Sequence, residues 1–289
     1  MELIQARGRL MAIGGGEDKK DDCRILKEFV RLAGGEKARI VVMTTATDLP
    51  EEVAEEYTEV FNRLGVKKVD AIDVSQRTDA MKPEFVKMVE EASGVFFTGG
   101  DQLHITSLMG GTPLQKIIVE RYEKDLIVAG TSAGAAMMGN SMILTGTSDE
   151  NPRSGSVEMA PGTDLIVGCT IDTHFSQRGR HGRLLTAVAH FPQDIGFGID
   201  ENTAMIVNKN QFEVIGEGAV TVIDGGAMSY TDVPYVKNGQ SIALAGVRIH
   251  VLPDGHKFDL KKREMIIPKQ VQSKAKRAAL NESGKSAKK

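Results

Sequence analysis

Short runs of β-branched and apolar residues alternate with longer stretches of helical period through the first half of this chain. The apolar runs predict strands at 10–13, 39–43, 68–74, 94–97 and 126–129. The intervening stretches place apolar residues three and four positions apart and predict helices at 21–32, 51–64, 84–92 and 114–122. Such alternation is typical of βαβ units. It predicts an α/β fold with a doubly wound, mostly parallel sheet, in which ligands bind beyond the carboxyl ends of the strands.

The strands predicted after residue 165 are shorter and punctuated by glycine. They lie at 196–200, 204–207, 213–215 and 219–223, and they read as a meander that continues the sheet in antiparallel fashion. Pro253-Asp254-Gly255 predicts a turn between strands at 247–252 and 257–260, so a final hairpin is expected to close the domain. No linker or internal repeat divides the chain. One α/β domain is therefore expected over residues 1–268.

Charge is distributed unevenly along the chain. Its 36 lysines and arginines against 39 acidic residues give a formal net charge of −3, yet residues 269–289 hold seven basic residues against one glutamate. This segment has almost no large apolar side chain to bury, so we expect a basic, disordered tail. The rest of the chain is acidic, which argues against specific nucleic-acid binding.

Several other classes of protein are excluded by composition. The apolar runs are far shorter than the ~20 residues needed to span a bilayer, and the acidic start Met1-Glu2 is unlike a signal peptide, so a cytoplasmic protein without membrane contact is expected. Cys23 and Cys169 are too few for a disulfide scaffold or a four-ligand zinc site and are interpreted as buried thiols. No cluster has metal-ligand spacing, so neither metal nor cofactor is expected.

The sharpest local signal is Gly-x-Ser-x-Gly at residues 130–134, which follows a buried strand and precedes small residues able to start a helix. Flanking glycines allow the tight strand-to-helix turn of a nucleophile elbow, which points the Ser132 hydroxyl into solvent. The backbone N–H of Ala133 then lies where an oxyanion forms. The alternative is a glycine-rich helix entry with Ser132 as its N-cap.

A serine nucleophile needs a base, and His174 is the best placed of the six histidines because it follows a strand-like apolar run. His104 and His181 remain alternatives on spacing alone. The base in turn needs a carboxylate to fix its tautomer. Asp200 and Glu201 end a predicted strand, and the pattern does not choose between them. The order serine, histidine, acid differs from that of the α/β-hydrolases.

Two glycine-rich turns follow other predicted strands. In residues 98–102 (TGGDQ), the backbone N–H of Gly100 is a candidate second oxyanion donor, and Asp101 and Gln102 are candidate substrate ligands; a plain turn explains the glycines equally well. The earlier segment 14–18 (GGGED) lacks the spacing of a dinucleotide-binding loop, and its acids would repel a pyrophosphate. Nucleotide binding is therefore not expected.

Arg178, Arg180 and Arg183 crowd six residues just past the candidate base. Guanidinium groups match carboxylates in bidentate geometry, and here they adjoin a candidate catalytic residue in an acidic protein. Recognition of substrate carboxylates is favoured over a solvated basic face.

Four segments taken together resemble the cyanophycinase family of the peptidase S51 group, which also contains the aspartyl dipeptidase called peptidase E. The resemblance runs from about residue 8 to residue 267. Its motifs are TGGDQ at 98–102, GTSAGA at 130–135, DTHFSQRGR at 172–180 and GIDENTA at 198–204.

The resemblance implies a three-layer αβα sandwich like that of class I glutamine amidotransferases, related to the flavodoxin-like folds, in a protein that is commonly a homodimer. It implies Ser132 as nucleophile, His174 as base and Glu201, in preference to Asp200, as the carboxylate of the base. The implied substrate is cyanophycin, a poly-aspartate with arginine attached to each β-carboxyl, released as β-aspartyl-arginine dipeptides.

The resemblance also assigns substrate contacts. The residues it places along the cleft are Asp101, Gln102, Asp172, Thr173, Arg178, Arg180 and Arg183, with the three arginines meeting carboxylates. Thr173 stands where the family leads us to expect glutamine. The same chemistry also suits an aspartyl or isoaspartyl dipeptidase of the peptidase E type. A non-catalytic glutamine-amidotransferase-like binding protein is a more remote alternative, since that fold favours cysteine at the elbow.

Overall fold

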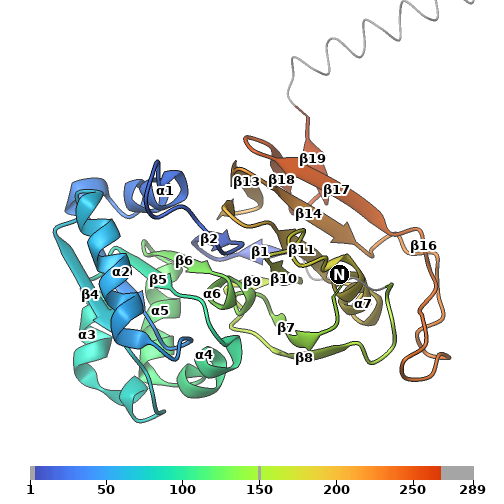
Figure 1. Ribbon diagram of the computed structural model, residues 1–289, viewed down its shortest axis with the longest axis horizontal. Coiled ribbons are helices and arrows are strands. Elements are labelled where there is room, and N and C mark those ends of the chain that lie inside the picture. The colour runs from blue at the N-terminus through green and yellow to red at the C-terminus, as the bar shows by residue number, and fades with distance from the viewer. Residues whose placement is uncertain (1–3, 149–150, 268–289) are drawn as a thin grey trace, which may run out of the picture.

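A parallel sheet forms one half of the molecule in the computed structural model, which describes residues 4–148 and 151–267 (Figure 1). The predicted tail, 269–289, lies outside the described residues. The strands are β2 (Arg9–Ile13), β3 (Arg39–Met43), β4 (Lys68–Ile72), β5 (Gly94–Phe97) and β6 (Ile127–Thr131). They run in the order β2-β6-β5-β3-β4, with every neighbouring pair parallel.

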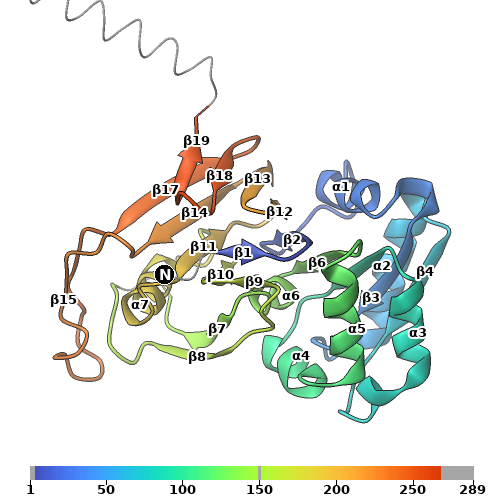
Figure 2. The same ribbon diagram turned by 180° about the vertical axis from the view of Figure 1, so that it is seen from behind.

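Helices cover both faces of this sheet. Successive strand residues point to opposite sides, and both faces of its strands are apolar. On β2, Met11 and Ile13 pack with α1 and α2, whereas Leu10 and Ala12 belong to the core on the other face. Figure 1 shows α2 in front of the sheet, and Figure 2, from behind, shows α3 and α5 in front of it. The helices are α1 (Arg24–Leu32), α2 (Pro50–Arg63), α3 (Pro83–Glu91), α4 (Gln102–Met109) and α5 (Pro113–Tyr122), with 3₁₀ turns η1 (Gly35–Lys37) and η2 (Asp79–Met81).

The sheet continues beyond β2 with antiparallel strands. These are β12 (Thr203–Asn208), β13 (Gln211–Gly216), β18 (Lys257–Asp259) and β19 (Glu264–Ile266), which complete a nine-stranded sheet within the described residues. β12 pairs with β2 along five residues, so the C-terminal part of the chain is joined directly to the first strand of the parallel half.

A second sheet, six-stranded in the part of the chain that the structure describes, packs on the same face as α3 to α5. Phe197 of this sheet meets Phe212 of the first edge-to-face at 5.5 Å. Its order is β17 (Arg248–Pro253), β14 (Ala219–Asp224), β11 (Ile195–Ile199), β10 (Cys169–Thr173), β7 (Ser141–Gly146) and β8 (Val157–Pro161). Helix α7 (His181–His190) covers its outer face through Leu184 and Val188. The remaining short strands are β1 (Gln5–Ala6), β9 (Ile166–Val167), β15 (Tyr230–Thr231) and β16 (Leu244–Ala245).

The expected α/β fold is confirmed, and the strands predicted at 39–43 and 94–97 coincide with β3 and β5. Two predictions for the second half are wrong. The meander is divided, since β12 and β13 continue the first sheet whereas β11 and β14 lie in the second. The predicted final hairpin does not form, because β17 pairs with β14 and β18 pairs with β13. A strand at the edge of a sheet has unpaired backbone N–H and C=O groups. The strand before the turn, β17, pairs with β14 of the second sheet, and the strand after it, β18, pairs with β13 of the first.

No described helix combines the length and apolar character needed to cross a membrane.

Candidate active site

Ser132 occupies a strained turn between β6 and the short helix α6 (Ala133–Ala136). Its φ of 53° and ψ of −115° are unusual for a residue with a side chain, and such strain concentrates at functional sites. Two glycines let the turn pack tightly: a Cβ at Gly134 would lie 2.4 Å from the carbonyl oxygen of Phe97, and a Cβ at Gly130 would lie 2.2 Å from that of Gly134. The strand, turn and helix together have the form of a nucleophile elbow.

Three side chains from three different loops form a hydrogen-bonded chain. The Ser132 Oγ lies 2.9 Å from His174 Nε2, and His174 Nδ1 lies 2.7 Å from Glu201 Oε1. Ser132 makes no side-chain cap to α6, so its hydroxyl is engaged with the histidine rather than with the helix. His174 follows β10 and Glu201 follows β11, two parallel neighbours in the second sheet. The site is thus assembled where the carboxyl ends of strands from both sheets meet.

The alternatives left open by spacing have other surroundings. The buried Asp200 accepts hydrogen bonds from the backbone N–H groups of Ser176 and Ala219, at 3.0 Å each, and so holds the loops around the site together. His104 and His181 lie exposed on α4 and α7, and neither bonds to Ser132.

The electrostatic environment keeps the imidazole of His174 neutral. Burial lowers its pKa below the usual value for histidine, and the nearby guanidinium groups of Arg178 and Arg180 lower it further, while the hydrogen bond to Glu201 acts in the opposite direction. A neutral imidazole whose Nδ1–H is held by a carboxylate presents a free lone pair at Nε2. His174 is therefore prepared to accept the proton of the Ser132 hydroxyl.

The backbone approaches Ser132 on two sides. Ala133 is the first residue of α6, and the first N–H groups of a helix have no partner within the helix. On the other side, a Cβ at Gly99 would lie 3.3 Å from the Ser132 Cβ, so this backbone is closely apposed to the serine. Gly100, with φ of 138°, instead packs against Ala46. The role of Gly100 as an oxyanion donor stays a prediction.

The loop after β2 contacts the site more extensively than its sequence indicated. The His174 N–H donates to the Gly14 carbonyl at 2.8 Å, and the Asn202 N–H donates to the Gly15 carbonyl at the same distance. A Cβ at Gly15 would lie 2.3 Å from the imidazole of His174, so only glycine fits there. The sequence was interpreted only for phosphate binding at residues 14–18, so this contact was not predicted. Position could have indicated it, because the loop follows β2, the strand that pairs with β6 and hence lies beside Ser132.

The arginine cluster has a partner inside the protein. Asp172 is 1% exposed and binds Arg183 in bidentate fashion, with Nε at 2.7 Å from Oδ2 and Nη2 on Oδ1. Arg180 donates to the same carboxylate at 3.2 Å and to the carbonyl of Thr173 at 2.7 Å. We expected these two arginines to meet substrate carboxylates, whereas here they neutralise a buried aspartate. A buried carboxylate is costly without such partners.

The other predicted contact residues are distributed around the site. Asp101 caps α4 by accepting from the Leu103 N–H at 2.7 Å, and Gln102 donates to the carbonyl of Ile143 at 2.7 Å. Thr173 is buried, and Arg178 is exposed directly after the histidine loop. Their roles toward a substrate stay predictions.

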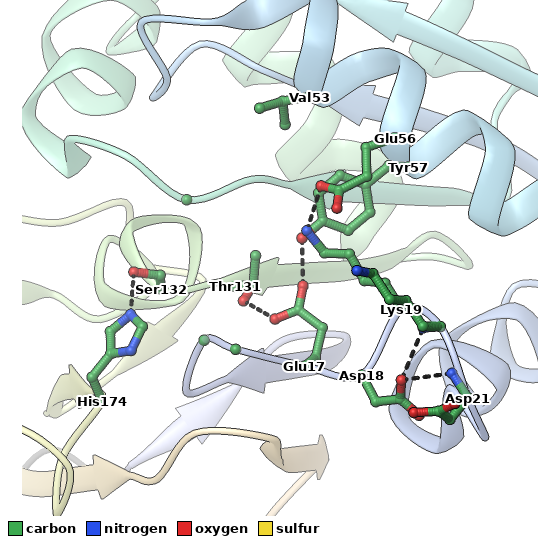
Figure 3. Close-up of a pocket in the computed structure, with 14 residues that line it drawn as sticks. Glu17, Asp18, Lys19, Asp21, Val53, Glu56, Tyr57, Thr131, Ser132 and His174 are labelled. Carbon is green, nitrogen blue, oxygen red and sulfur yellow. Dashed lines mark hydrogen bonds and ion pairs between the residues drawn. The ribbon is translucent and has the colours of Figure 1, made fainter.

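A pocket of about 580 Å³ opens beside Ser132 and His174, which lie on one side of it in Figure 3, with Glu17, Tyr57 and Lys19 on the other. The described residues contain no group of three or more His, Cys, Asp or Glu side chains that could hold a metal ion.

The chain matches the model of peptidase family S51 over residues 10–215. Among curated proteins it is similar to the cyanophycinase of Geminocystis herdmanii, with 38% identity over 257 residues that cover 88% of this chain and 94% of the relative. It is 37% identical to the cyanophycinase of a Nostoc species, with 89% of this chain and 87% of the relative covered.

The fold is also similar to a solved structure. The crystal structure of a peptidase from an acI-B1 Actinobacterium matches with a TM-score of 0.63 and 22% identity, covering 88% of this chain and 97% of that one.

Proposed function

The chain belongs to peptidase family S51, and on that premise we propose that it is a serine peptidase that degrades cyanophycin to β-aspartyl-arginine dipeptides. The proposal is carried by one combination: hydrogen bonds link Ser132, His174 and Glu201 in a chain that is 38% identical to a cyanophycinase over most of its length.

In the first step the Ser132 Oγ attacks the scissile carbonyl carbon. His174 Nε2 takes the hydroxyl proton, and the carboxylate of Glu201 stabilises the imidazolium through the Nδ1–H. The oxygen of the tetrahedral intermediate accepts from the Ala133 N–H and from the backbone of the Gly99-Gly100 turn. Collapse of the intermediate expels the amine, which receives the proton from His174, and leaves an acyl ester on Ser132.

In the second step water attacks the ester. His174 takes a proton from the water and returns it to the Ser132 Oγ as the C–O bond breaks, so the dipeptide leaves with a free carboxylate. The neutral ground state of His174 suits both half-reactions, because the same nitrogen acts as base and then as acid.

The buried ion-pair cluster of Asp172, Arg180 and Arg183 supports this machinery as a positioning device. Arg180 joins the Asp172 carboxylate to the carbonyl of Thr173, the residue before His174, and so fixes the start of the histidine loop. The exposed Arg178 stays the arginine best placed to meet a carboxylate of the substrate.

Digestion of purified cyanophycin, with mass detection of the products, tests the function. We expect β-aspartyl-arginine as the main product and a higher kcat/KM for the polymer than for α-aspartyl dipeptides of the Asp-Leu type. Ser132→Ala protein is the control and should release nothing. A preference for the dipeptides would contradict the proposal and favour a peptidase E type of specificity.

The sequence leads us to propose two further properties, a homodimer and a location in the cytoplasm. Sedimentation analysis of the purified protein tests the first, with a monomer contradicting it. Fractionation of the source cells tests the second.

A further inference from the structure

The pocket beside the Ser132–His174 pair has a second wall that the peptidase mechanism does not use. Figure 3 shows Glu17, Tyr57 and Glu56 on this wall, across the opening from Ser132 and His174. Glu17 comes from the loop after β2, and the other two come from α2. We call Glu17, Glu56 and Tyr57 the cation subsite for the reasons that follow.

The carboxylate of Glu17 is buried, with 6% of the residue exposed. It accepts hydrogen bonds from the hydroxyl of Tyr57 and from Thr131 Oγ1, the latter at 2.6 Å. Both donors are neutral, and burial together with the charge of Glu17 raises the pKa of Tyr57 well above its usual value, so its proton stays in place. No Lys, Arg or His among the described residues forms an ion pair with Glu17. A buried carboxylate without a cation is energetically expensive.

The same wall already accommodates a cation of the chain itself. Lys19 Nζ lies 2.6 Å from Glu56 Oε2 and 4.3 Å from the centre of the Tyr57 ring, and its side chain is only 24% exposed. A carboxylate beside an aromatic face is a favourable environment for a positive group. A guanidinium suits it better than an ammonium, because it is planar, weakly hydrated and able to stack on the ring.

The pocket lining carries a formal charge of −2, from the four acids Glu17, Asp18, Asp21 and Glu56 against Lys19 and Lys20. Lys19 pairs with Glu56, whereas Asp18 is occupied by the backbone N–H groups of residues 20, 21 and 23. Those bonds hold the pKa of Asp18 at about 2, so it remains charged within its own turn. Glu17 is the buried acid of the pocket that is left without a positive partner. Each of its oxygens has a second lone pair to offer.

Resting on the proposed function, we propose that the cation subsite receives the guanidinium of the arginine attached to the aspartate next to the scissile bond. The Glu17 carboxylate accepts the guanidinium N–H groups beside the Tyr57 ring, over which Lys19 Nζ already lies at 4.3 Å. Thr131 donates a hydrogen bond to Glu17 and directly precedes Ser132, so an arginine bound to Glu17 is held at a fixed position relative to the Ser132 hydroxyl. The subsite thereby selects arginine-bearing units over bare aspartate.

The test compares β-aspartyl-arginine oligomers with oligomers in which citrulline replaces arginine. Citrulline keeps the length and shape of the side chain and lacks its charge. The wild-type enzyme should prefer arginine over citrulline in kcat/KM by at least about 30-fold, the effect of losing a desolvated charge pair. Glu17→Gln, which keeps hydrogen bonding to Tyr57 and Thr131, should abolish this preference. Glu59→Gln, the same change at an exposed position of α2, should preserve it.

An equal loss of rate on both oligomers in Glu17→Gln, with the arginine preference intact, would overturn the proposal and leave Glu17 a purely positioning residue. A second variant, Lys19→Met, removes the chain's own cation from the pocket and should increase the arginine preference. An unchanged or lower preference would also overturn the subsite.

Binding separates this proposal from the proposed function. Calorimetry on Ser132→Ala protein should show tighter binding of β-aspartyl-arginine than of β-aspartyl-citrulline. The double variant Ser132→Ala, Glu17→Gln should bind the two ligands equally. Equal binding of the two ligands by Ser132→Ala protein contradicts the subsite. Failure of the wild-type enzyme to digest cyanophycin, with the binding difference intact, contradicts the proposed function alone.

Discussion

Two buried carboxylates near the Ser132–His174 pair are balanced in opposite ways. Asp172 is 1% exposed and is bound by the guanidinium groups of Arg180 and Arg183. Glu17 is 6% exposed, and within residues 4–148 and 151–267 its partners are the hydroxyl groups of Tyr57 and Thr131. Each is tied to the residue that precedes a member of the serine–histidine pair, through Arg180 on one side and directly on the other.

The partners of a buried carboxylate distinguish a structural charge from one that is available to a ligand. A carboxylate that is neutralised inside the protein has its partner already and acts on the fold. A carboxylate that is buried beside a pocket, with hydrogen bonds but no opposite charge, is completed by what enters the pocket. Burial and residue type alone do not separate the two cases, whereas the identity of the partners does.

The largest effect is expected at the triad itself. Ser132→Ala or His174→Ala should lower kcat by ~10⁴ to ~10⁶, because the members of such a unit act together. The melting temperature should stay near that of the wild type and serves as the control. If either variant retains more than about a tenth of the wild-type rate, Ser132 and His174 are not the catalytic pair.

A large loss of stability is expected for Asp172→Asn. The substitution leaves the buried guanidinium groups of Arg180 and Arg183 without their carboxylate, and breaking a buried pair in this way costs about 3 to 5 kcal/mol. Denaturant unfolding measures the effect. Asp125→Asn is the matched control, since Asp125 pairs with Arg121 at the surface and should cost under about 1 kcal/mol.

If Asp172→Asn is as harmless as the surface control, the cluster of Asp172, Arg180 and Arg183 does not stabilise the fold. The arginines would then be available to substrate, as the sequence led us to expect.

Glu17→Gln is expected to leave the free energy of unfolding unchanged or to increase it, in contrast to Asp172→Asn. This change removes a buried charge that has no cation and keeps groups able to bond to Tyr57 and Thr131, so the free energy of unfolding should stay within about 1 kcal/mol of the wild type or increase. The same unfolding experiment measures it. A loss comparable to that of Asp172→Asn would mean that Glu17 is balanced within the protein after all.

The sequence predicted the part of the fold whose signals are local. The strands at 39–43 and 94–97 and the elbow around Ser132 follow from periodicity and glycine spacing over a few residues. The assignment of β11 and β14 to a second sheet did not follow, because alternation shows which face of a strand is buried and not which strand lies beside it.

The site divides in the same way. Strand-end logic indicated Ser132 and His174, but Glu201 was separated from Asp200 only by family resemblance, since adjacent acids carry the same pattern. The partners of Asp172 and Glu17 lie 8 to 114 positions away in the sequence, so local spacing does not predict them. The sequence therefore showed that charged side chains gather near the site without revealing which of them were already paired.

The smallest effect is expected in the pH dependence of Arg178→Ala, since Arg178, unlike Asp172 and Glu17, is exposed. Arg178 is one of the cations that lower the pKa of His174. A positive charge disfavours the imidazolium, so its removal should raise that pKa. Because activity requires neutral His174 and is lost as the pH falls through its pKa, the acid limb of the kcat/KM profile should move to higher pH. Arg31→Ala on α1, where Arg31 pairs with Glu28, should leave the limb in place. Added salt should shrink the shift, as it does for exposed charges. An acid limb that stays in place in Arg178→Ala would mean that burial and the internally paired Arg180 alone set the proton affinity of the base.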